Sequence, residues 1–242
     1  MLSLFENCNT SPTPSICIRI LHDNTLTQDN RDKLIQIAER YGQQLKFYNV
    51  EELCIDRIAE IRRYIPNPGD NRKIGDNRFT IGTYYRFFIP FVLPTEINKV
   101  IYLDGDVIIT LDINEFWQVD LGDSPLGVVT SGLKSLRGIV KDTDYFNAGV
   151  LLMNLKILRD EYKVVQAGMK FLAENPQLFR WGDQDLLNYC FAVRAMKLPD
   201  KFNFRVCSMA RPRNESPGKK FTITWASTSR CITSKTSSAS YG

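Results

Sequence analysis

The sequence predicts an α/β fold with a mostly parallel sheet. Short β-branched stretches alternate with stretches whose apolar residues recur at helical spacing, and this alternation is typical of strand–helix–strand units. The chain has 242 residues, 43% of them hydrophobic, which is ample for a sizeable core. No apolar stretch reaches the ~18 residues that a membrane-spanning helix needs, so no such span is predicted.

The first third of the chain contains two strand patterns, and a helical pattern follows each of them. The predicted elements are a strand over residues 16–21, a helix ended by Gly42, a strand over residues 45–50, a helical pattern over residues 51–64 ended by Pro66, and a loop over residues 67–76. The apolar spacing that marks the first helix is carried by Leu34, Ile37, Ala38 and Tyr41.

The rest of the chain continues the alternation. Thr80 can cap a helix that runs to Phe88 and beyond, and Pro90 kinks or ends it. The later elements are strands that begin at Val100, at Leu126 and at Tyr145, the last two running to Val129 and Met153, and helices over residues 112–117, 155–173 and 183–193.

Composition bounds the domain organisation and the partners. A single domain is expected over residues 1–226, and a disordered tail over residues 227–242, because Ser and Thr dominate there and bury little apolar surface. The six cysteines form no CxxC pair, which favours reduced thiols in a cytoplasmic protein. The net charge of +4 is mild, so no nucleic-acid partner is expected.

The most informative motif is an Asp-Gly-Asp triplet at the carboxyl end of an apolar strand. In extended backbone, residues i and i+2 point to the same side, so Asp104 and Asp106 form an oxygen-rich pair, and Gly105 lets a ligand approach the backbone. Such a pair suits a hard divalent cation and a phosphate-bearing substrate. The alternative is a polar strand end that merely starts a turn.

Together with this strand, three further segments resemble the family 8 glycosyltransferases, of the bacterial lipopolysaccharide galactosyl- and glucosyltransferase type. They are Tyr-Tyr-Arg-Phe at residues 84–87, Tyr-Phe-Asn-Ala-Gly-Val-Leu-Leu-Met-Asn at residues 145–154, and Trp-Gly-Asp-Gln-Asp-Leu-Leu-Asn at residues 181–188. The similarity runs from about Ile18 to Phe204, and its order and spacing make it specific. It implies a GT-A fold, a Rossmann-like α/β/α sandwich that binds a nucleotide sugar at the carboxyl ends of its strands.

The resemblance also implies an activity: retaining transfer of a hexose from a UDP-hexose donor to a saccharide hydroxyl, with Mn²⁺ or Mg²⁺. The metal ligands would be Asp104 and Asp106, and the donor would be held by Arg86, Asp104, Asn147, the backbone of Ala148, Asp183 and Gln184. Asp183 and Gln184 would lie at the reacting sugar. An amide is a poor nucleophile, so a front-face route, in which the leaving phosphate accepts the proton, is favoured over a covalent intermediate on Gln184.

Two departures from the family pattern concern the ends of the chain. The residues from Met1 to Asn7 resemble the helix that follows the family's first strand and base-binding loop, so that strand is expected to be missing and its neighbours in the sheet unpaired. The family's late H-x-x-G-x-x-K-P-W element, which supplies a histidine ligand to the metal, has no counterpart after residues 221–226. His22 is the only histidine, and it is expected to be structural. Reduced or absent activity is therefore expected.

Three alternatives remain open from the sequence. A catalytically inactive nucleotide-sugar-binding remnant would retain the site without turnover. A haloacid dehalogenase-like phosphatase also uses an Asp-x-Asp motif after a strand, but the position four residues after Asp104 is Ile108, and no matching lysine motif follows. The basic segment Arg205–Lys220 can dock on an anionic membrane surface, since the family's acceptors are lipid-linked sugars, or it can be a solvated loop.

Overall fold

The computed structural model describes residues 1–8, 16–64, 81–132, 135–136, 138–204 and, by its backbone, 231–235. The helices are α1 (Leu2–Glu6), α2 (Gln28–Arg40), α3 (Val50–Leu53), α4 (Ile55–Tyr64), α5 (Ile89–Val92), α6 (Asn114–Trp117), α7 (Leu155–Asp160), α8 (Tyr162–Glu174) and α9 (Asp183–Phe191), with 3-10 turns η1 (Ile81–Phe87), η2 (Pro176–Leu178) and η3 (Asp200–Phe202). The strands are β1 (Cys17–His22), β2 (Gln44–Asn49), β3 (Lys99–Leu103), β4 (Leu126–Val128), β5 (Val150–Asn154), β6 (Met196–Lys197) and β7 (Cys231–Lys235).

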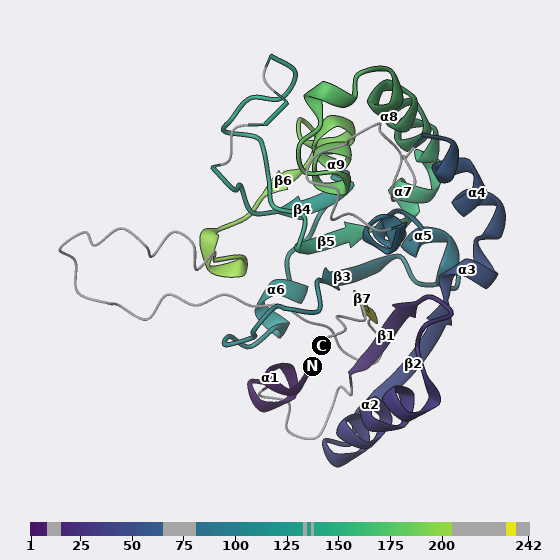
Figure 1. Ribbon diagram of the computed structural model, residues 1–242. Coiled ribbons are helices and arrows are strands. Elements are labelled where there is room, and N and C mark those ends of the chain that lie inside the picture. Colours follow the sequence, from purple (N-terminus) through teal and green to yellow (C-terminus); the bar gives the residue numbers. More distant parts are fainter. Residues whose placement is uncertain (9–15, 65–80, 133–134, 137, 205–230, 236–242) are drawn as a thin grey trace.

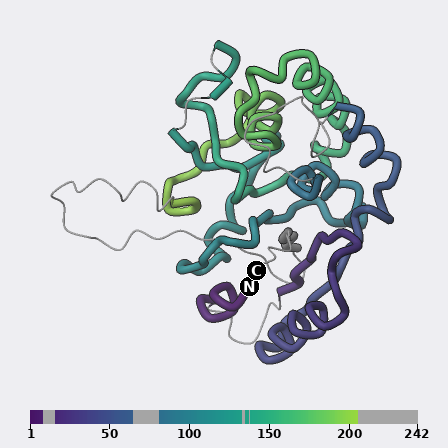
Figure 2. The backbone as a smooth tube through the Cα atoms, viewed as in Figure 1, coloured from purple at the N-terminus to yellow at the C-terminus, as the bar shows by residue number. Residues whose placement is uncertain are grey.

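The strands form one 7-stranded sheet in the order β2-β1-β7-β3-β5-β4-β6 (Figure 1). Strand β5 runs antiparallel to both of its neighbours, β3 and β4, and the other four pairings are parallel. The elements β1, α2 and β2 therefore lie at one end of the sheet, and β4 and β6 lie at the other (Figure 2). The predicted α/β class with a mostly parallel sheet is confirmed.

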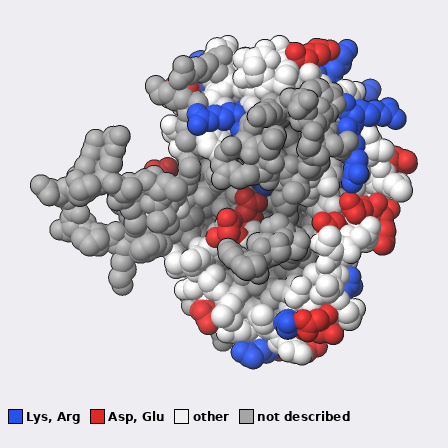
Figure 3. Space-filling view, viewed as in Figure 1, with Lys and Arg blue, Asp and Glu red and all other residues white. Residues whose placement is uncertain are grey.

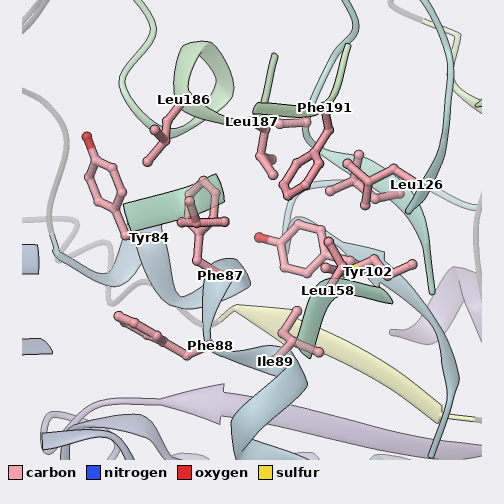
Figure 4. Close-up of a cluster of buried hydrophobic side chains, with 14 of the residues drawn as sticks. Tyr84, Phe87, Phe88, Ile89, Tyr102, Leu126, Leu158, Leu186, Leu187 and Phe191 are labelled. Atoms are coloured by element: carbon pink, nitrogen blue, oxygen red, sulfur yellow. The ribbon is translucent and has the colours of Figure 1, made fainter. Parts of the chain in front are cut away.

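Helices cover both faces of the sheet because the central strands are apolar on both sides. On β3, Val100 and Tyr102 belong to one apolar cluster, together with residues of α4, α5, α7, α8 and α9. The intervening Ile101 and Leu103 belong to a second cluster, together with residues of α1, α2 and α6. Figure 4 shows part of the first cluster, with Tyr102 lying among apolar side chains of several helices. This alternation produces the α/β/α sandwich.

Several predicted elements are shorter in the structure than in the pattern. The helix expected over residues 155–173 is broken at Glu161, because α7 packs on α5 while α8 packs on α4 and α9. Arg159 holds α7 against the segment of residues 90–97, where its guanidinium group donates to the carbonyl oxygens of Pro90, Pro94, Thr95 and Ile97. The helix expected up to Phe88 is the 3-10 turn η1, and Pro90 lies in the first turn of α5.

The strand expected from Tyr145 begins only at Val150. Phe146 forms an isolated bridge with Thr130, and side-chain hydrogen bonds from Asn188 on α9 replace a second ladder. Residues 147–149 thus form a turn at the start of β5, directly beside the end of β3. This shortening is what brings the turn to the functional site described below.

The prediction of disorder over residues 227–242 is wrong for β7. This strand lies between β1 and β3 and runs parallel to both, which satisfies backbone groups that would otherwise be unpaired. Ile232 and Thr233 are β-branched and suit a strand. The unpaired neighbours expected from the absence of the family's first strand are not found at β1 or β3, because each of these strands has a partner on both sides. The remaining residues of the predicted tail, and residues 221–226, lie outside the described part of the chain.

Glycine at position 168 allows α8 and α9 to pack closely. A Cβ atom added there would lie 2.7 Å from Cys190 Sγ and 2.9 Å from Leu186 Cδ1. We expect Gly168→Ala to lower the free energy of unfolding by about 1–2 kcal/mol, despite the better helix propensity of alanine, because the added methyl group would overpack the contact between α8 and α9. Urea unfolding measures this, and Gly168→Ala/Cys190→Ala should recover part of the loss. Equal stability of Gly168→Ala and the parent would contradict the packing.

No helix among the described residues is long and apolar enough to cross a membrane.

Candidate functional site

The site lies where the carboxyl end of β3 meets the start of β5. Because these strands are antiparallel, Leu103 pairs with Val150, and the Asp104 N–H donates to the Gly149 carbonyl oxygen at 2.9 Å. The Asp-Gly-Asp segment and the Asn-Ala-Gly turn are therefore adjacent, although they are more than 40 residues apart in the chain. In the space-filling view, acidic atoms are visible near the middle of the face shown (Figure 3).

Arg86 joins three of the predicted segments. Its Nη2 lies 2.9 Å from Asp104 Oδ1, its Nε lies 2.9 Å from Asp183 Oδ2, and its Nη1 donates to the Ala148 carbonyl oxygen. The Arg86 side chain is only 5% exposed, which excludes a solvated surface arginine. Its guanidinium group also lies 4.6 Å from the centre of the Tyr102 ring.

The charge balance around Arg86 keeps it protonated. Burial lowers the pKa of the guanidinium group, but the neighbouring Asp183, Tyr102 and Asp104 outweigh that effect and raise it above its usual value. Burial has the opposite effect on Tyr102, because it raises the pKa of the phenol. The phenol therefore stays neutral, and its hydroxyl donates to Asp104 Oδ1 at 2.6 Å. One oxygen of Asp104 thus accepts from both Arg86 and Tyr102.

Gln184, at the start of α9, holds the Asn-Ala-Gly turn. Its Oε1 accepts from Asn147 Nδ2 at 3.0 Å and from the backbone N–H of Ala148 at 3.1 Å. Asn147 Oδ1 in turn accepts from the backbone N–H of Gly149 at 3.0 Å and from Asn203 Nδ2 at 2.9 Å. The predicted donor-binding residues of the turn and of α9 are therefore one hydrogen-bonded unit.

Sequence reasoning missed the residues that support this unit. Asp185 is fully buried, and it accepts hydrogen bonds from the backbone N–H groups of Arg180 and Trp181 and from the Tyr145 hydroxyl. Asn188 grips both backbone groups of Phe146. Helical spacing carried a signal, because positions 185 and 188 share a helix face, but it did not reveal the partner segment. Alternation in an extended chain likewise places residues 102 and 104 on the same side, which indicates that Tyr102 can contact Asp104.

The backbone around Asp106 is not the extended strand on which the pairing of the two carboxylates was argued. Strand β3 ends at Leu103, and Gly105 and Asp106 lie in a turn in which the Val107 N–H approaches the Asp104 carbonyl oxygen at 3.4 Å. Turn chemistry of Gly and Asp explains this. Asp106 is exposed, and the Asp104 side chain is 32% exposed. Metal binding by this pair stays a prediction.

Asp104 and Asp106 could supply part of the coordination of a cation, but not all of its ligands. Among the described residues, no group of three or more His, Cys, Asp or Glu side chains is arranged to hold a metal ion. Asp104 Oδ1 is committed to Arg86 and Tyr102, whereas Oδ2 lies on the side of Gly149, where an added Cβ would approach it to 3.0 Å. A cation held by one or two carboxylates and completed by substrate phosphates matches this donor set.

Other predicted residues lie apart from the site or outside the described chain. His22 is buried at the end of β1, with Nδ1 2.8 Å from the Asp23 carbonyl oxygen, so the structural interpretation is confirmed. Tyr84 and Tyr85 are buried core residues. The basic segment Arg205–Lys220 lies outside the described residues.

Comparison with known proteins agrees with this arrangement. Residues 3–224 match the family model "Glycosyl transferase family 8". The chain is 30% identical to glycosyltransferase GlyE of Streptococcus pneumoniae over 183 residues, which are 69% of this chain and 42% of GlyE. It is 25% identical to lipopolysaccharide 1,2-glucosyltransferase of Escherichia coli K12 over 131 residues, which are 50% of this chain and 37% of that protein. The chain thus spans less than half of the length of either relative.

Solved structures share the fold. The galactosyltransferase LgtC, in complex with donor and acceptor sugar analogues, superposes with a TM-score of 0.60 at 22% identity, over 81% of this chain and 77% of LgtC. A variant of LgtC with an active-site glutamine replaced by glutamate gives a TM-score of 0.63. The architecture is therefore the GT-A fold, and the chain belongs to glycosyl transferase family 8.

Proposed function

We propose that this glycosyltransferase moves a hexose from a UDP-sugar to a saccharide hydroxyl with retention of configuration, assisted by Mn²⁺ or Mg²⁺. The observation that carries the proposal is the hydrogen-bonded cluster in which buried Arg86 joins Asp104, Asp183 and the turn at Ala148. It assembles polar groups for phosphates and for sugar hydroxyls at the carboxyl end of β3, where open α/β sheets bind nucleotides. The relatives named as glycosyltransferases support the same reading.

Asp104 and Asp106 are the residues that would hold the cation. A divalent cation bound there would neutralise the charge that develops on a departing diphosphate. Arg86 holds Asp104 in place through Oδ1 and adds a permanent positive charge beside it. This chain's contribution is therefore to fix one carboxylate rigidly and to leave the second one, Asp106, on a turn that faces solvent.

The contacts of Gln184 argue against a covalent intermediate on that residue. An amide oxygen is a weak nucleophile, and Gln184 Oε1 already accepts two hydrogen bonds, from Asn147 and Ala148. A front-face route requires no protein nucleophile, since the leaving phosphate takes the proton of the attacking hydroxyl. In that route Gln184 and Asp183 orient the donor sugar, and they exclude water from one side of it.

The acceptor and its location belong to the proposal as well. A saccharide or a lipid-linked saccharide is the proposed acceptor, and the basic segment Arg205–Lys220 is the proposed contact with an anionic membrane surface at the cytoplasmic side. Sedimentation with liposomes tests this part separately. Co-sedimentation that does not depend on the content of anionic lipid would contradict it.

The test of the proposed function is the release of free UDP from UDP-galactose and UDP-glucose in the presence of Mn²⁺. We expect release that EDTA abolishes, because chelation would remove the cation that stabilises the departing diphosphate. Calorimetric titration with UDP accompanies the assay. Binding of UDP without turnover would favour a catalytically inactive remnant, and the absence of both would overturn the proposal.

A further inference from the structure

A second chain of hydrogen bonds runs from Gln184 into the interior, away from the proposed donor site. Gln184 Nε2 donates to the Tyr145 hydroxyl oxygen at 3.1 Å, and the Tyr145 hydroxyl lies 2.5 Å from Asp185 Oδ1. Asp185 is 0% exposed, and its Oδ2 accepts from the backbone N–H groups of Arg180 and Trp181 at 2.6 and 2.5 Å. The Tyr145 and Asp185 side chains are both fully buried.

One end of the chain fixes the orientation of the Gln184 amide from outside. The Ala148 backbone N–H can only donate, so the Gln184 atom that faces it at 3.1 Å must be the oxygen. Asn147 is oriented in the same way, because its Oδ1 faces the Gly149 N–H and its Nδ2 must therefore face Gln184. The Gln184 Nε2 group is left to point toward Tyr145.

The other end gives the same orientation independently. A carboxylate accepts hydrogen bonds and donates none, so the single proton of the Tyr145 hydroxyl goes to Asp185 Oδ1. The Tyr145 oxygen can then only accept from Gln184, and a hydrogen bond with Ser135 occupies its remaining side. Burial and the adjacent Asp185 raise the pKa of Tyr145, so this proton is retained at any working pH.

We propose that Asp185, acting through the Tyr145 hydroxyl, is a positioning residue that fixes the orientation of the Gln184 side-chain amide and so presents the Asn147–Ala148 turn to the donor sugar. The inference rests on the proposed function of the site, which it deepens. Asp185 and Tyr145 touch no substrate. Their effect on turnover passes through Gln184, whose Nε2 group has the Tyr145 hydroxyl as its acceptor while its Oε1 holds the turn.

A purely structural role for Tyr145 predicts something different. The main chain at Phe146 is already held by Asn188, which bonds both of its backbone groups. Removing the Tyr145 hydroxyl should therefore leave the backbone in place while the Gln184 Nε2 group loses its acceptor. The two roles separate in any measurement that reports on Gln184 alone.

The first test is nuclear magnetic resonance of the ¹⁵N-labelled protein without ligand. The two side-chain amide protons of Gln184 are assigned by their disappearance in Gln184→Ala. In Tyr145→Phe we expect these peaks to move toward the positions of solvent-exposed glutamine. The matched control is Tyr85→Phe, which removes another buried hydroxyl, one with no hydrogen-bond partner among the described residues, and it should leave them unchanged. Unchanged Gln184 peaks in a folded Tyr145→Phe variant would overturn the proposal.

A second variant covers the case in which Tyr145→Phe fails to fold. Asp185→Asn is isosteric, and its amide oxygen must face the two backbone donors, so its NH₂ group faces Tyr145. In a Ser135→Ala background the phenol proton then competes with the Ala148 N–H for the Gln184 oxygen, and we expect the Gln184 amide peaks to shift. Gln184 peaks identical to those of Ser135→Ala alone would refute the role of Asp185.

The kinetic test is a double-mutant cycle on UDP release. Tyr145→Phe should lower kcat about 10-fold, the effect of losing roughly one hydrogen bond, with a smaller change in the KM of the donor. In the Gln184→Ala background the same substitution should change kcat less than about 2-fold. Equal effects in both backgrounds would show a structural role. If the parent protein releases no UDP, the proposed function fails, while the amide resonances still decide the positioning role.

Discussion

Arg86→Met is expected to lower the free energy of unfolding by about 3 kcal/mol or more and to abolish donor binding. The methionine keeps most of the volume but removes the cation between Asp104 and Asp183, which leaves two carboxylates facing each other across a buried site. Asp183 is only 5% exposed and loses the partner that offsets its desolvation. Urea unfolding of parent and variant, and calorimetric titration with UDP, measure the two effects.

The control for Arg86→Met is an ion pair of the same kind at the surface. Lys33 and Asp29 form an i, i+4 pair on α2 with side chains that are 64% and 73% exposed. Lys33→Met should change stability by less than about 0.5 kcal/mol, because water screens the pair. A loss below about 1 kcal/mol for Arg86→Met, with UDP binding retained, would show that the cluster does not organise the site.

The fold follows from the sequence where the signal is local. Short runs of β-branched and apolar residues located β1 and β3, and the stop at Gly42 located the end of α2, where that glycine adopts a φ of +62°. The breaks came from tertiary contacts that no local pattern carries. The 155–173 helix divides because its two halves pack on different helices. The strand expected at Tyr145 is shortened because the Asn188 side chain takes the backbone hydrogen bonds of Phe146.

Strand β7 is a strand that the local sequence did not predict. Composition alone predicts disorder for Cys231–Lys235, because these five residues lie in a stretch of Ser and Thr and composition carries no information about the neighbouring strands. Their place between β1 and β3 depends on register with strands more than 100 residues away, and such pairing is invisible to a local pattern.

The residues of the candidate site were found by type and order, but their interactions were not. Arg86 is expected to hold the donor, and the structure adds that its N–H groups face Asp104, Asp183 and the Ala148 carbonyl oxygen. The distinction matters for experiments. A residue that contacts substrate changes affinity when it is replaced, whereas one that organises two carboxylates also changes stability.

Asp106→Asn is expected to separate activity from stability. Asp106 is exposed and, among the described residues, takes part in no hydrogen bond or ion pair, so its replacement should leave the melting temperature within about 1 °C of the parent. If Asp106 holds the cation of the proposed function, Mn²⁺-dependent UDP release should fall at least about 100-fold, because the charge that develops on the diphosphate loses its stabilisation. Titration with Mn²⁺ in the presence of UDP reports the binding step.

Two comparisons make the Asp106 result decisive. Asp123 is exposed and precedes β4, and because β3 and β4 both run antiparallel to β5, it lies at the opposite edge of the sheet from Asp104. Asp123→Asn should therefore change neither stability nor UDP release. Asp104→Asn should lower both, since Arg86 and Tyr102 lose a charged partner. Full Mn²⁺-dependent activity in Asp106→Asn would remove this residue from the metal site and leave Asp104 alone to hold a cation, which a single carboxylate does weakly.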